Sequence, residues 1–120
     1  MIPDHPQRDY RGQRILVMGL GSFGGGLGVV KFLAQRGAQI TITDARPADK
    51  LADAIKELQE IAGLQFRLGG HSDDDFRNAD LIVVNPAVRP DHPSLNLARS
   101  IGVPLTSEMN FTSTNLRAMK

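Results

Sequence analysis

The stretch RILVMGLGSFGGGLG, residues 14–28, decides the fold. Its first part is an unbroken apolar run, which is typical of a strand buried on both faces of a parallel sheet. Gly19, Gly21 and Gly24 then form a Gly-x-Gly-x-x-Gly pattern at the point where a helix should begin. Such glycines let the chain turn tightly, approach an anion and pack the helix on its strand. We therefore expect a nucleotide site here, the alternative being a glycine turn kept only for packing.

Strands and helices alternate along the rest of the chain, with short connections. The pattern predicts five strands, at 14–18, 39–43, 64–68, 80–84 and 103–106. It also predicts four helices. The first runs from within the glycine stretch to about residue 36, the second spans 47–62, the third is one short turn at 72–75 capped by Ser72, and the fourth spans 93–101. Pro104 indicates that the fifth strand lies at an edge. This order predicts an α/β, Rossmann-like three-layer domain with a mostly parallel five-stranded sheet.

The length of 120 residues fits one domain. We expect residues 1–12 to be an N-terminal tail, ordered only near Tyr10, residues 13–111 to form the domain, and residues 112–120 to begin a linker.

The composition excludes several functional classes. Fourteen Lys and Arg oppose thirteen Asp and Glu, so the net charge of +1 predicts no nucleic-acid or anionic-membrane partner. The absence of Cys excludes disulfides, thiolate catalysis and Cys-based zinc sites. The longest apolar run is far shorter than the ~20 residues that cross a bilayer, and the N-terminus lacks a signal core. We expect a cytoplasmic protein.

The candidate ligand site lies where the carboxyl ends of the parallel strands meet. Asp44 stands twenty residues after Gly24, where a carboxylate can accept hydrogen bonds from a ribose hydroxyl or a base. Arg46 could pair with a phosphate or lie in solvent. Asp73–Asp75 is interpreted as a solvated, capped turn rather than a metal site, and Glu108 either meets a partner group or starts a helix.

The chain shows neither a nucleophile with an adjacent base nor paired catalytic carboxylates. His5, His71 and His92 have no metal-ligand spacing and are interpreted as loop residues. We therefore expect no catalytic residue, no metal and no cofactor in this domain, which is typical of a binding module of a larger protein.

The sequence resembles the N-terminal domain of the Mur ligases, most closely those that join D-glutamate to UDP-N-acetylmuramoyl-L-alanine in peptidoglycan synthesis. The resemblance covers residues 12–111 and rests on four pieces in order, namely VMGLG at 17–21 with FLAQRG at 32–37, TDAR at 43–46, ADLIVVNPAV at 79–88, and HPSL at 92–95 followed by IGVPLTSE at 101–108.

The resemblance implies that the domain binds the UDP part of UDP-N-acetylmuramoyl-L-alanine. ATP and magnesium would belong to the central and C-terminal domains of a parent chain, because this chain stops at Lys120, before any Gly-Lys-Thr/Ser phosphate loop. It implies a truncated piece of a larger ligase that is not itself catalytic.

The resemblance also assigns UDP-binding residues. Backbone amides of the turn Gly21, Ser22, Phe23 and Gly24, extended to Gly25, would meet the diphosphate; Asp44 and Ala45, next to Arg46, would meet the uracil; and Asn85, Pro86 and Ala87 would line the other side. The glycine turn is about two residues longer than the family pattern, so the contacting amides lie among residues 22–26. Ala87 stands where the family usually has Gly.

Two other functions remain open at the level of sequence. A regulatory NAD-binding module would use the glycine pattern and Asp44, but has no use for Asn85–Val88 or for Ser107 and Glu108. A non-catalytic interaction domain would keep the fold without the ligand.

Overall fold

The computed structural model describes residues 10–20, 25–61, 63–85 and 88–107. In this part of the chain it contains a five-stranded sheet in the order β3-β2-β1-β4-β5, in which neighbouring strands pair in parallel. The elements are β1 Arg14–Met18, α1 Gly25–Gln35, β2 Gln39–Asp44, the 3-10 turn η1 Ala48–Lys50, α2 Ala52–Leu58, β3 Gln65–Leu68, α3 Asp73–Asn78, β4 Leu81–Val84, α4 Pro93–Ser100 and β5 Leu105–Ser107. The predicted fold class is confirmed.

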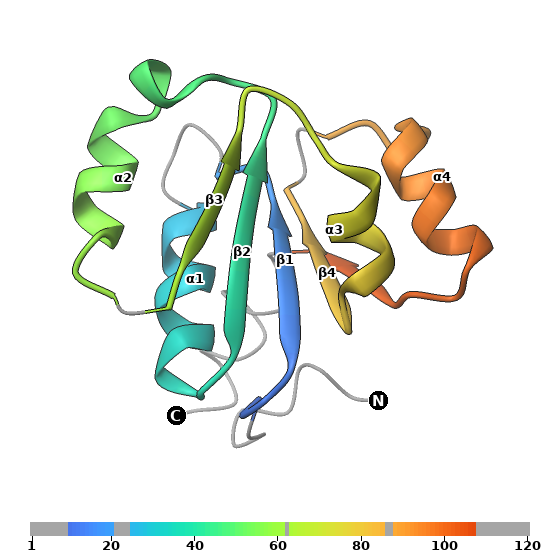
Figure 1. Cartoon of the computed structure of the whole chain (residues 1–120), viewed down its shortest axis with the longest axis horizontal. Helices are drawn as coiled ribbons and strands as arrows, with labels where there is room; N and C mark the ends of the chain where they lie inside the picture. Colours follow the sequence, from blue (N-terminus) through green and yellow to red (C-terminus); the bar gives the residue numbers. More distant parts are fainter. Residues whose placement is uncertain (1–9, 21–24, 62, 86–87, 108–120) are drawn as a thin grey trace.

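The central strand β1 is buried on both faces, as its unbroken apolar run predicts. Ile15 and Val17 belong to one hydrophobic cluster, whereas Leu16 and Met18 belong to the other. This division follows from the alternation of side chains along a strand. The first cluster joins the sheet to α1 and α2, and the second joins it to α3 and α4. Figure 1 shows the two helix pairs on either side of β1.

The helix predicted at 47–62 is shorter and divided. Pro47 precedes the 3-10 turn η1, and α2 then ends at Leu58. Leu51 and Leu58 are buried in the cluster beneath α1 and α2, so the two pieces still present one apolar face to the sheet.

The hydrogen bonds at the starts of α3 and α4 were not predicted from the sequence. Ser72 is the N-cap residue of α3, as predicted, but its side chain makes no cap hydrogen bond; its backbone carbonyl accepts from Asp75 N instead. The helix extends to Asn78 and is longer than the single predicted turn. The start of α4 is capped by His92, whose Nδ1 accepts a hydrogen bond from Ser94 N at 3.1 Å.

Backbone hydrogen bonds hold the first and last described segments, at Tyr10 and at β5, against the rest of the fold. Within the described residues, strand β5 pairs with β4 and lies at the sheet edge, as Pro104 predicted. Tyr10 is fully buried, and its backbone N–H donates to Arg36 O. No helix in the described ranges is long and apolar enough to cross a membrane.

Candidate functional site

The candidate site lies at the carboxyl edge of the sheet, where β1 and β2 end beside β4. The helices that follow β1 and β4 pack on opposite faces, so their connecting chains separate at this point. Parallel α/β sheets bind ligands in the crevice that such a separation creates. The upper end of the sheet in Figure 1 is this edge.

Gly19 allows the end of β1 to pass closely between β2 and the chain after β4. Its N–H donates to Thr43 O at 2.8 Å, and Asn85 N donates to Met18 O at 3.0 Å. Gly19 has φ +87°, and a Cβ there would lie 3.2 Å from Asn85 Cβ. Both the backbone conformation and the space therefore require glycine.

The carboxylate of Asp44 is the main hydrogen-bond acceptor of this edge. Its Oδ1 accepts from the backbone N–H and the Nε of Arg46, each at 3.0 Å. Its Oδ2 accepts from Leu20 N at 3.1 Å and from Arg46 Nη2 at 2.9 Å. Four donors occupy the roughly four acceptor sites of a carboxylate. In this arrangement Asp44 has no acceptor left for a ligand unless Arg46 moves.

Electrostatics keep Asp44 ionised. Burial raises the pKa of Asp44, but the hydrogen bonds from Arg46 and Leu20 together lower it more, so its pKa lies below the ordinary value of 3.8. The hydrogen bonds to Asp44 raise the pKa of Arg46. The pair is asymmetric, since the Asp44 side chain is 6% exposed and that of Arg46 is 41% exposed. Arg46 thus keeps N–H groups directed away from Asp44 for another partner.

The structure describes five of the predicted site residues, namely Gly25, Asp44, Ala45, Arg46 and Asn85. Gly25 opens α1, Ala45 is exposed beside Arg46, and Asn85 is buried at the end of β4. The remaining predicted residues, Gly21, Ser22, Phe23, Gly24, Pro86 and Ala87, lie outside the described residues. Glu108 does as well.

Two histidines at this edge were not predicted as site residues. His71 and His92 lie in loops, as expected, but their rings meet at a centroid distance of 5.2 Å with an interplanar angle of 85°. The turn Gly69–Gly70 brings His71 there, because Gly70 pairs with Asp44 and Gly69 N donates to Asp44 O at 3.0 Å. The two histidines are distant in sequence and share no helical or strand spacing, so no sequence signal links them.

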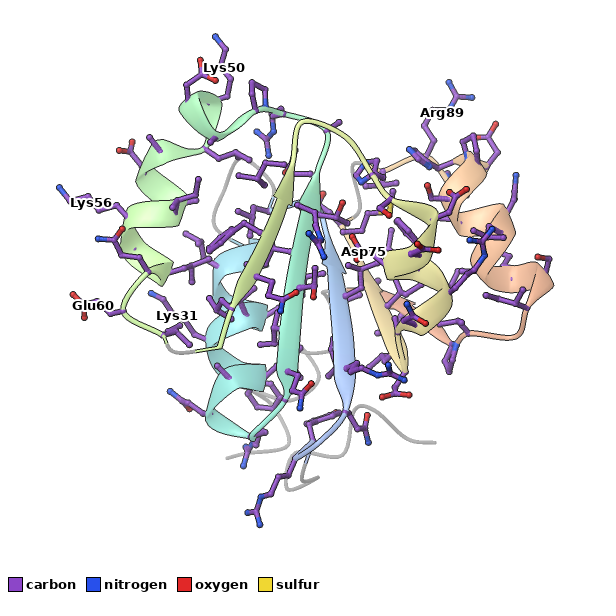
Figure 2. All side chains as sticks on the ribbon, viewed as in Figure 1. Lys31, Lys50, Lys56, Glu60, Asp75 and Arg89 are labelled. Atoms are coloured by element: carbon purple, nitrogen blue, oxygen red, sulfur yellow. The ribbon has the colours of Figure 1, made fainter. Side chains whose placement is uncertain are left out.

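A hollow of about 610 Å³ adjoins the edge beside Leu20 and Arg46, between the start of α1 and α2. Its size is within the range of small-ligand sites. A second hollow, of about 520 Å³, lies on the sheet face between the strands and α3, around Thr41 and Asp75. Figure 2 shows Asp75 on that side of α3. We assign the candidate site to the first region, because Arg46 and Lys50 lie there beside Leu27, in the first turn of α1. Asp49, Asp53 and Glu57 also line this hollow.

Cationic side chains also flank the edge. Figure 2 shows Lys50 and Arg89 projecting outward from the chain after β2 and the chain after β4. Arg89 pairs with Asp91 at 3.2 Å. Among the described residues, no three His, Asp or Glu side chains are grouped closely enough to hold a metal ion.

The substitution Gly19→Ala tests the close approach of β1 to Asn85. We expect it to lower the free energy of unfolding by about 2 kcal/mol or more, because positive φ strain and overpacking add. Gly63→Ala is the matched control, since Gly63 has φ +86° but nothing within 4 Å of a Cβ, and should cost about 1 kcal/mol. Urea unfolding measures both; equal losses would refute the close contact.

The substitution Asp44→Asn tests the buried acceptor. We expect a loss of about 2 kcal/mol at neutral pH, because the amide cannot accept four hydrogen bonds. Since the pKa of Asp44 is lower when folded, its stabilisation is complete above about pH 4 and disappears as the pH falls through the folded-state pKa. The variant and the unsubstituted chain should therefore approach one another in unfolding free energy as the pH falls below the folded-state pKa of Asp44. Asp91→Asn, at an exposed ion pair, should change stability by less than about 0.5 kcal/mol. A constant difference across pH would contradict this account.

Comparisons with known proteins identify a family. Residues 13–107 match the family described as "Mur ligase MurD-like, N-terminal domain". The chain is 50% identical over 102 residues to the UDP-N-acetylmuramoylalanine–D-glutamate ligase of Roseiflexus sp. (strain RS-1), covering 83% of this chain and 21% of that protein. It is 39% identical over 109 residues to the ligase of the same name from Acidobacterium capsulatum, covering 91% and 23%. The chain thus spans about a fifth of the length of these curated relatives.

Solved structures show the same fold. The UDP-N-acetylmuramate-alanine ligase of Thermotoga maritima superposes with a TM-score of 0.68 at 24% identity, over 90% of this chain and 24% of that one. The pseudomurein peptide ligase type C of Methanothermus fervidus gives 0.62 at 26% identity, over 82% and 20%. The NADP complex of Pseudomonas aeruginosa RhlG gives 0.54 at 23% identity, over 81% and 47%, so the fold alone does not select the ligand. The match over residues 13–107 does select the family: the chain belongs to the Mur ligases, as a MurD-like N-terminal domain.

Proposed function

We propose that this chain is the UDP-binding domain of an ATP-dependent ligase that joins D-glutamate to UDP-N-acetylmuramoyl-L-alanine in peptidoglycan synthesis. The family match and the names of the relatives support the substrate. The observation in the structure that carries the proposal is the start of α1, which points to the carboxyl edge and has no acidic residue in its first turn. The amino end of a helix attracts anions, and no carboxylate of α1 opposes a diphosphate there.

The site residues keep the roles proposed from the resemblance. Amides of the turn from Gly21 to Gly25 bind the diphosphate, Asp44 and Ala45 meet the uracil, and Asn85, Pro86 and Ala87 form the other wall. The bonding of Asp44 refines this proposal. Asp44 holds Leu20 N, and so fixes where the glycine turn begins. A direct bond from Asp44 to uracil requires Arg46 to release one oxygen, which its partly exposed side chain can do by turning toward the diphosphate.

The other parts of the parent reaction lie outside this domain. ATP, magnesium and D-glutamate would bind to central and C-terminal domains, with which this domain would pack. The domain itself would hold and orient the nucleotide end of the substrate. The proposal includes the cytoplasmic location expected from the sequence.

Amide NMR titration with UDP-N-acetylmuramoyl-L-alanine, and separately with NAD, tests the proposal. We expect shifts at Leu20, Gly25, Ala45, Arg46 and Asn85 with the UDP ligand only. Arg46→Ala should weaken binding about tenfold through loss of a charge-assisted contact. Arg99→Ala, at the far end of α4, should leave the affinity within about twofold.

Two results would count against this function. Shifts with NAD alone would favour the regulatory NAD-binding module. Shifts with neither ligand, in a chain whose spectrum is folded, would favour a non-catalytic interaction domain.

A further inference from the structure

The Arg46 guanidinium lies between the Asp44 carboxylate and the hollow at the carboxyl edge. Leu20 and Arg46 both donate hydrogen bonds to Asp44, and both line that hollow. The Asp44 side chain is 6% exposed, whereas that of Arg46 is 41% exposed. A ligand in the hollow therefore meets the guanidinium before it can reach the carboxylate.

The four donors to Asp44 are of two kinds. Two are backbone N–H groups, that of Leu20 on Oδ2 and that of Arg46 on Oδ1. The other two belong to the Arg46 side chain, whose Nε donates to Oδ1 at 3.0 Å and whose Nη2 donates to Oδ2 at 2.9 Å. The guanidinium thus fills one acceptor position on each oxygen, and these two positions can be vacated without moving the backbone.

The loop that carries Arg46 is held by backbone bonds. Gly69 N donates to Arg46 O and to Asp44 O, each at 3.0 Å. The bond from Arg46 N to Asp44 Oδ1 also uses the backbone, so any residue except proline can make it at this position. We therefore expect a change of the Arg46 side chain to leave the loop, and the bond from Leu20 N to Asp44, in place.

The two positions that Arg46 fills are those that a dinucleotide would use. In Rossmann domains that bind NAD, an acidic residue in this part of the chain accepts a hydrogen bond from a ribose hydroxyl. The adjacent 2′ and 3′ hydroxyls of that ribose offer two donors to one carboxylate. Asp44 stands at the end of β2, where such a residue is expected, but all four of its acceptor positions are filled. Its bonding therefore opposes a ribose diol.

A uracil ring requires less from the same carboxylate. In a uridine nucleotide the ring has one N–H group, so it needs a single acceptor. Release of Oδ2 by Arg46 Nη2 supplies that acceptor while Nε stays on Oδ1. A ribose diol needs an acceptor on each oxygen, and hence departure of the whole guanidinium from Asp44. That departure breaks both charge-assisted bonds of the pair, whereas uracil breaks one.

We propose that Arg46 is a specificity-determining residue, which allows a uracil nucleotide to bind and excludes NAD by filling the acceptor positions of Asp44 that a ribose diol needs. The inference rests on the proposed function, in which the UDP ligand binds at this edge. Both ligands carry a diphosphate, so a contact between Arg46 and phosphate does not distinguish them. They differ in the number of donors that each presents to Asp44.

Calorimetric titration of the unsubstituted chain and of Arg46→Ala with NAD tests the proposal. The substitution vacates one acceptor position on each oxygen of Asp44. The dissociation constant for NAD should therefore fall at least about tenfold, as for one or two new hydrogen bonds to a charged group. The dissociation constant for UDP-N-acetylmuramoyl-L-alanine should rise about tenfold. The preference between the two ligands should thus change by about a hundredfold.

A second ligand and two further variants test whether the gain depends on the carboxylate and the diol. NADP has a phosphate in place of the 2′ hydroxyl, so Arg46→Ala should not tighten its binding. Asp44→Asn, added to Arg46→Ala, should abolish the gain for NAD, because the carboxylate is lost; an amide spectrum checks that this chain is folded. Arg89→Ala is the matched control, since it removes an exposed cation at the same edge. It should leave the affinity for NAD unchanged.

The outcomes distinguish this inference from the proposed function. If the unsubstituted chain binds the UDP ligand, NAD binding that Arg46→Ala leaves unchanged or weakens would overturn the inference alone. An equal gain for NADP, or a gain that persists without the Asp44 carboxylate, would also overturn it, because the vacated positions would then not recognise a diol. Failure of the unsubstituted chain to bind the UDP ligand would overturn the proposed function, and the inference with it.

Discussion

The ionised carboxylate of Asp44 organises the carboxyl edge of this domain. It joins the end of β2 to Leu20, at the end of β1, and to Arg46 in the following loop. The backbone carbonyl of Asp44 accepts a hydrogen bond from the N–H of Gly69, and Gly70 forms a bridge with Asp44. Both glycines lie in the turn that follows β3. A buried charge that holds four donors is costly to disturb, because each donor would lose its partner away from water. One residue therefore fixes the relative positions of three chain segments.

The rest of the fold supplies a rigid base for that carboxylate. Strand β1 has apolar side chains on both faces and pairs with β2 and β4 in parallel. The carboxyl ends of the strands consequently lie at one edge, and the helices leave that edge on opposite faces. The crevice and the start of α1 follow from this topology, whereas the choice of ligand depends on the few side chains and amides placed there.

Much of this arrangement could be predicted from sequence, because the signals are local. The apolar run after Arg14 predicted the central strand, and the glycine pattern predicted the start of α1, which the structure puts at Gly25. The position of Asp44 at the end of β2 could also be predicted. Its bonding could not, because Leu20 reaches it only through tertiary packing. The His71–His92 contact was missed for the same reason, since it depends on the turn at Gly69–Gly70 and on the meeting of two loops.

The central claim is that the edge organised by Asp44 is where the UDP ligand binds. A crystal structure of the chain with UDP-N-acetylmuramoyl-L-alanine tests it most directly. The account predicts the diphosphate within hydrogen-bond distance of the amides that lead into α1, with Leu20 N still held by Asp44. A ligand seated on the sheet face near Asp75, or a diphosphate away from the start of α1, would contradict it.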